Sequence, residues 1–140
     1  MKILVDTSVW SLALRKKKLT KREQAIVDEF KEIIHELRVT IIGPIRQELL
    51  SGISEEYKCF LLKEKLKPFE DLSIPQEDYE TAAELSNICR RKGIQGSHTD
   101  FLICAVALNK KMSIFTTDKD FTNYKKHIDI KLHQIREEFT

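Results

Sequence analysis

Short apolar, β-branched runs alternate along this chain with longer segments in which apolar residues recur at helical spacing. Strands that alternate with helices in this way form right-handed βαβ crossovers, and these produce a mostly parallel sheet. The sequence therefore predicts an α/β fold. Strands are expected at residues 2–5, 39–42, 68–72, 113–116 and 128–132, with 68–72 at an edge because it contains a proline.

Several helix boundaries can be read from single residues. Pro44 suits the first turn of a helix, and Gly52 and Gly93 follow helical patterns that they are expected to end. The chain contains no linker, repeat or low-complexity segment, so residues 1–140 are expected to form one domain. Helices are expected at residues 7–14, 21–36, 44–50, 55–66, 76–92 and 99–110, followed by a charged tail at 134–139. The core-facing positions expected in 76–92 are Tyr79, Ala82, Ala83, Leu85, Ile88 and Cys89.

The charge balance gives little indication of a partner, because 24 Lys and Arg residues against 22 Asp and Glu residues leave a net charge of only +2. Basic residues cluster at 15–18 with 21–22, at 90–92 and at 110–111. On a common face these clusters would attract a phosphate backbone, whereas separately they are typical of solvated helix ends.

The three cysteines are odd in number and form no C-x-x-C pair, which favours free thiols in a reducing compartment. The chain shows no signal-peptide pattern. Its longest apolar run, at 101–108, is too short to span a bilayer. A cytoplasmic protein with no membrane partner is expected.

Four acidic residues are placed to meet at one edge of the expected sheet. Asp6 directly follows the first strand, and Asp118 follows the strand at 113–116. Glu48 lies on the short helix after the second strand, and Asp100 lies in the first turn of the apolar helix. Ligands of such sheets bind beyond the carboxyl ends of the strands, so the four carboxylates are expected to share a crevice.

Carboxylates that share a crevice repel each other unless a cation lies between them, and Mg²⁺ prefers oxygen ligands. Each residue also has a simpler interpretation. Ser97 and Asp100 match a capping box, as do Thr117 and Asp120, and Glu48 fits an ordinary surface position. The joint placement of four acids favours a metal site, which would polarise a phosphodiester and activate water.

The segments around these acids resemble the motifs of the PIN-domain family, in the same order and over nearly the whole chain. The small single-domain form is similar to the VapC toxins of bacterial and archaeal toxin–antitoxin systems. The segments are residues 5–8 (VDTS), 44–52 (PIRQELLSG), 99–105 (TDFLICA) and 116–121 (TTDKDF).

This resemblance implies a three-layer α/β/α sandwich with strand order 3-2-1-4-5, and Mg²⁺- or Mn²⁺-dependent endoribonuclease activity. It also implies a homodimer and a small antitoxin protein as partner. The residues that fall on the four family acids, which act as catalytic residues and metal ligands, are Asp6, Glu48, Asp100 and Asp118.

Other positions of the family pattern have supporting roles. Thr7 and Thr117 fall where small hydroxyl side chains commonly support the site. The pattern also contains Asp120, but Asp118 is preferred as the fourth acid because it lies nearer the strand end, and Asp120 is expected to cap the following helix. His98 departs from the small residue of many relatives and is interpreted as a loop histidine.

The expected reaction is in-line attack of metal-activated water on an RNA phosphodiester, with Asp6 and Asp100 as principal ligands and Glu48 and Asp118 completing the shell. A receiver domain would need an acidic pair after the first strand, where Asp6 stands alone. A phosphatase with an Asp-x-Asp nucleophile is disfavoured by Ser8. A PIN-like scaffold that binds RNA or protein without cleaving it remains the alternative.

Overall fold

The computed structural model describes residues 1–136, and its sheet forms where the apolar runs are shortest and most buried. β1 (Ile3–Val5) is buried throughout and pairs in parallel with β2 (Val39–Thr40) on one side and β3 (Ser113–Phe115) on the other. The strands therefore have the order β2-β1-β3. The register aligns Val5 with Phe115, which places the residues after these two strands side by side.

The expected outer strands at 68–72 and 128–132 lie at the expected edges, but each forms only a single parallel bridge. Asp71 pairs with Ile41 beside β2, and Leu132 pairs with Ile114 beside β3. Adding these two positions to the three strands gives the order 3-2-1-4-5 that the family resemblance implies, with the five expected strands numbered along the chain. They do not extend further as strands, and Asp71 instead accepts a hydrogen bond of 2.9 Å from Arg46 Nε.

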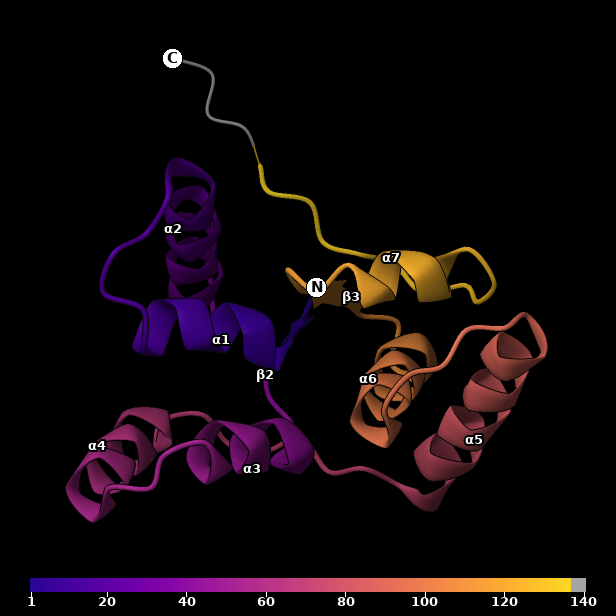
Figure 1. Ribbon diagram of the computed structural model, residues 1–140, viewed down its shortest axis with the longest axis horizontal. Helices are drawn as coiled ribbons and strands as arrows, with labels where there is room; N and C mark the ends of the chain where they lie inside the picture. The colour runs from indigo at the N-terminus through magenta and orange to yellow at the C-terminus, as the bar shows by residue number, and fades with distance from the viewer. Residues whose placement is uncertain (137–140) are drawn as a thin grey trace.

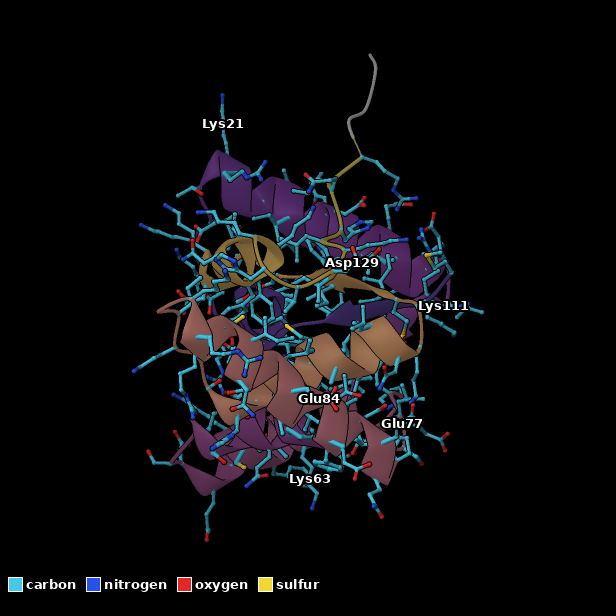
Figure 2. All side chains as sticks on the ribbon, turned by 90° about the vertical axis from the view of Figure 1, so that its right-hand side faces the viewer. Lys21, Lys63, Glu77, Glu84, Lys111 and Asp129 are labelled. Carbon is cyan, nitrogen blue, oxygen red and sulfur yellow. The ribbon has the colours of Figure 1, made fainter. Side chains whose placement is uncertain are left out.

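The described residues form seven helices. The first six begin and end within one residue of the expected bounds, and no bounds were expected for the seventh. Figure 1 and Figure 2 show α2 on one side of the sheet and α5 and α6 on the other, which is the α/β/α sandwich, and α7 contacts the beginning of α6. The helices are α1 (Thr7–Leu14), α2 (Lys21–His35), α3 (Gly43–Ser51), α4 (Glu56–Leu66), α5 (Gln76–Arg91), α6 (His98–Asn109) and α7 (Asp120–Lys125).

α6 is the central helix of the core. Every residue from Phe101 to Ala107 is buried, since the helix packs against β1 and β3 and is covered by α5. This explains why its sequence lacks the polar face of a surface helix. Cys89 and Cys104 are free and fully buried, as expected, and burial raises the pKa of the Cys104 thiol. None of the described helices combines the length and hydropathy needed to cross a membrane.

The expected core face of α5 is partly wrong. Tyr79 is 54% exposed and Ala83 is exposed, whereas Asp78 is buried. Asn109 Nδ2 and Lys110 Nζ, at the C-terminal end of α6, donate hydrogen bonds of 2.8 and 2.9 Å to the Asp78 carboxylate. These bonds satisfy a buried charge and turn α5 so that Tyr79 faces outward. The expected positions that do pack inward are Ala82, Leu85, Ile88 and Cys89.

The segment that follows the last bridge crosses over α2. Glu29 of α2 is buried, and its carboxylate lies 2.6 Å from His133 Nε2 and 3.1 Å from Arg136 Nε. Arg136 also pairs with Glu36, which lowers the pKa of that carboxyl. The remaining part of the expected charged tail, 137–139, lies outside the described residues.

Candidate metal centre

Asp6 leaves β1 and becomes the N-cap of α1. Its backbone amide donates to Phe115 O (2.8 Å), which continues the parallel pairing with β3. Its Oδ2 accepts hydrogen bonds of 2.8 Å from both the Ser8 and the Thr116 hydroxyl, and the residue is only 6% exposed. Asp6 is thus a buried carboxylate whose orientation is fixed by two hydroxyl donors from two elements.

Asp100 lies in the first turn of α6, where Ser97 acts as N-cap by accepting the Asp100 amide (3.0 Å). The cap is made by the Ser97 hydroxyl and the Asp100 amide, not by the Asp100 carboxylate. The Asp100 Oδ2 accepts a 2.7 Å hydrogen bond from Tyr124 Oη. Burial raises the pKa of Asp100, as do the charges of Asp6 and Asp118, while the bonds from Tyr124 and Ser97 oppose the rise.

Asp118 and Asp120 complete a compact acidic group with Asp100. One carboxylate oxygen from each of the three lies within 4.8 Å of the others. Asp118 Oδ1 also accepts the Asp120 amide (2.9 Å), and its own amide donates to Thr116 Oγ1 (3.0 Å). The expectation that Asp120 caps the following helix is wrong. Lys119 is the N-cap of α7 and makes no side-chain capping bond, and the Asp118 carboxylate accepts the amide two residues further on as in an Asx turn. The Asp120 carboxylate lies in the acidic group.

Glu48 is exposed on α3 and lies beside the first turn of α1. Its Oε1 accepts a 3.1 Å hydrogen bond from the Thr7 hydroxyl, so Thr7 contacts a predicted site acid as expected. Glu48 also shares a surface pocket with Thr99, which precedes Asp100. The Arg15 side chain donates to the carbonyl of Leu49 and so ties α1 to this helix. Glu48 therefore borders the site without belonging to the group of three acids.

The hydroxyl that supports the site is that of Thr116, not that of the expected Thr117. Thr117 contributes its backbone amide, which donates to Ser8 Oγ (3.0 Å), and its side chain is exposed. Sequence reasoning missed Ser8, Thr116 and Tyr124 as supporting residues. No sequence signal pointed to Thr116, because its place beside Asp6 depends on the register that pairs Val5 with Phe115.

Tyr124 had no sequence signal beyond its position one helical turn after Asp120. It is fully buried. Burial, followed by the bond to Asp100, raises the pKa of the Tyr124 hydroxyl, so it remains a proton donor at neutral pH.

The basic clusters are divided between structural and free positions. Lys16 pairs with Glu23, and Lys110 pairs with Asp78. Arg22 and Lys119, by contrast, line a cavity of about 460 Å³ that also includes Asp118. Arg90 lines a second cavity with His98 and Thr99, next to Asp100. Cations therefore flank the acidic residues on two sides.

The donor set suits a hard divalent cation. Carboxylate oxygens are the preferred ligands of Mg²⁺, and like charges at these distances need a counter-charge. Within residues 1–136, no Lys, Arg or His forms an ion pair with the acids of the site, which are Asp6, Glu48, Asp100, Asp118 and Asp120.

Fold and site together define a parallel α/β/α domain with an acidic centre at the carboxyl edge of its sheet. The model of the PIN domain matches residues 3–127, and the chain belongs to the PIN domain family. No curated protein sequence matches the chain significantly.

Solved structures with the same fold cover nearly the whole chain. FitAcB from Neisseria gonorrhoeae is 22% identical, with a TM-score of 0.75, over 94% of this chain and 96% of its own. DNA-bound VapBC from Salmonella typhimurium is 16% identical, with a TM-score of 0.74, over 95% and 97%. VapBC2 from Rickettsia felis is 16% identical, with a TM-score of 0.73, over 95% and 98%.

Proposed function

We propose that this protein is a metal-dependent endoribonuclease that hydrolyses RNA phosphodiester bonds. The observation that carries the proposal is a group of three carboxylates near the buried Asp6, with no basic ion-pair partner within residues 1–136, in a PIN domain. Mg²⁺ or Mn²⁺ would be held by Asp6, Asp100 and Asp118 together with Asp120, with Glu48 at the margin. When bound, the ion supplies charge that polarises the phosphodiester and favours hydroxide over water.

The residues of the chain itself have separate tasks in this proposal. Ser8 and Thr116 orient the Asp6 carboxylate, so that it need not reorganise when a cation arrives. Glu48 is exposed, and within the described residues its carboxylate accepts a side-chain hydrogen bond only from the Thr7 hydroxyl. This carboxylate is therefore suited to accept a proton from the attacking water. Arg22 and Lys119 lie where they can hold a phosphate next to Asp118.

We further propose that the protein is the toxin of a toxin–antitoxin pair and acts on RNA in the cytoplasm as a homodimer. Similar folds occur in structures described as a toxin–antitoxin complex from Klebsiella pneumoniae and as VapBC-5, a member of the VapBC family of toxin–antitoxin systems, from Mycobacterium tuberculosis. α4 exposes Tyr57, Phe60 and Leu61, an apolar group that suits a protein partner. Co-purification with a small protein encoded by a neighbouring reading frame tests the antitoxin proposal.

The decisive experiment is RNA cleavage with metal and with a chelator. Cleavage is expected with Mg²⁺ or Mn²⁺ and is expected to stop in EDTA. Asp6→Asn and Asp100→Asn should abolish it, because an amide oxygen lacks the charge that holds the ion. Asp129→Asn, at the exposed position labelled in Figure 2, is the matched control and should cleave normally. RNA binding without cleavage by the wild type would instead favour the non-catalytic scaffold.

A further inference from the structure

Tyr124 is a large buried side chain whose only polar atom contacts the acidic site. Its ring is fully buried against Phe101 of α6 (centroid distance 4.8 Å) and Phe121 of α7 (5.3 Å). Its hydroxyl donates to Asp100 Oδ2 at 2.7 Å, a length typical of a bond to a charged acceptor. The aromatic contacts would be equally available to phenylalanine, so packing does not explain the hydroxyl.

Gly96 fixes the place of this hydroxyl from the opposite side. A Cβ atom at Gly96 would clash with Tyr124 Oη, lie 2.8 Å from Tyr124 Cζ and lie 2.9 Å from Phe101 Cε2. The backbone of residue 96 therefore covers the hydroxyl end of Tyr124, and a side chain at position 96 would occupy the space that this hydroxyl fills. With ring and hydroxyl both enclosed, the hydrogen bond to Asp100 has little freedom to move.

We propose that Tyr124 is a positioning residue of the metal centre, which holds Asp100 Oδ2 and so keeps this carboxylate against Asp118 and Asp120. The inference rests on the proposed function. α7 begins at Asp120 and carries Tyr124 one turn later, so one short helix sets two neighbours of Asp100. Tyr124 engages only one carboxylate oxygen of Asp100, and the geometry leaves Oδ1 out of this bond.

Two effects of losing the hydroxyl oppose each other. Without the donor, Asp100 keeps more electron density for a cation but loses its fixed orientation. Hydrogen-bond partners of metal ligands typically contribute about 10–100-fold to metal affinity or activity, which indicates that orientation dominates. Loss of the hydroxyl is therefore expected to weaken metal binding.

The test measures Mn²⁺ binding to the RNA-free protein by calorimetry, alongside RNA cleavage. Tyr124→Phe keeps the aromatic packing, and we expect it to raise the Kd for Mn²⁺ by about 10-fold or more. Tyr79→Phe removes a hydroxyl from a ring that is 54% exposed and is the matched control, with unchanged binding expected. Thermal melting of each variant verifies that it is folded.

Gly96→Ala is the second variant, because it retains the hydroxyl but displaces it. It should weaken Mn²⁺ binding in the same direction as Tyr124→Phe. If both variants bind Mn²⁺ as tightly as the wild type while Asp100→Asn does not, the positioning role is refuted and the proposed function stands. If the wild type binds no Mn²⁺, or Asp100→Asn binds it normally, the positioning role and the proposed function both fail.

Discussion

Replacing Asp100 with Asn should make the metal-free protein more stable while it removes activity. Two carboxylates lie within 4.8 Å of Asp100. At that separation the repulsion between two like charges is roughly 1 kcal/mol in water and about 3–4 kcal/mol at an effective dielectric of 20. Because Asp120 is exposed, the value in water, roughly 1 kcal/mol per pair, applies here. Relief from Asp118 and Asp120 is thus about 2 kcal/mol.

The opposing effect is a weaker bond from Tyr124, since its acceptor becomes neutral, and this costs about 1 kcal/mol. The amide of residue 100 keeps its Ser97 cap in either case. The net gain in the free energy of unfolding is therefore about 1 kcal/mol, or a Tm increase of about 3 °C for a domain of this size.

The pH dependence follows from the direction of the pKa shift. Burial and neighbouring charges raise the pKa of Asp100 in the folded protein above its unfolded value. The wild type therefore loses stability as the pH rises from the unfolded pKa through the folded one. The advantage of Asp100→Asn should be present at pH 7 and should diminish as the pH falls toward the unfolded pKa of Asp, about 4.

The assay is thermal melting of both proteins in EDTA and in Mg²⁺. Saturating Mg²⁺ at ten times its Kd should stabilise the wild type by about 1.4 kcal/mol through binding to the folded state, and the variant much less. The four-acid site would be refuted by a variant that melts lower in EDTA together with an equal response of both proteins to Mg²⁺. Asp100 would then be a purely structural residue.

Two further predictions concern the acids and hydroxyls around Asp100. Asp118→Asn should reduce metal-dependent cleavage more than Asp120→Asn. Because Asp120 caps no helix, its variant should lose Mn²⁺ affinity rather than stability; unchanged affinity with a lower Tm would contradict this. Thr116→Val should lower the free energy of unfolding by about 1.5–3 kcal/mol and weaken Mn²⁺ binding, because the buried Asp6 carboxylate loses one of its two half-buried hydroxyl donors. Thr122→Val, at an exposed position of α7, is the control, and equal effects of the two Thr variants would refute the role of Thr116.

The sequence by itself determined most of the helices and the three central strands, and it placed acidic residues at the carboxyl edge of the sheet. Helical periodicity and residues such as Pro44 and Gly52 are local signals, so the bounds of α1 to α6 could be predicted to within one residue. Asp6 could be placed for the same reason, since it directly follows a buried strand. The parallel arrangement then followed from the alternation of strands and helices.

Only the tertiary structure decided which partners the site residues have. The hydroxyl that reaches Asp6 comes from Thr116 rather than Thr117, because the register of β1 against β3 joins residues 110 positions apart. Tyr124 reaches Asp100 because α7 packs across the beginning of α6.

The outward turn of Tyr79 has a similar cause. The buried carboxylate of Asp78 accepts hydrogen bonds from Asn109 and Lys110, which lie at the end of α6. Because these donors belong to another part of the chain, the sequence of α5 shows no periodic pattern that would reveal the burial of Asp78. Periodicity is set by residues within a few positions of each other. Orientation at a site depends on register and packing between elements that only folding brings into contact.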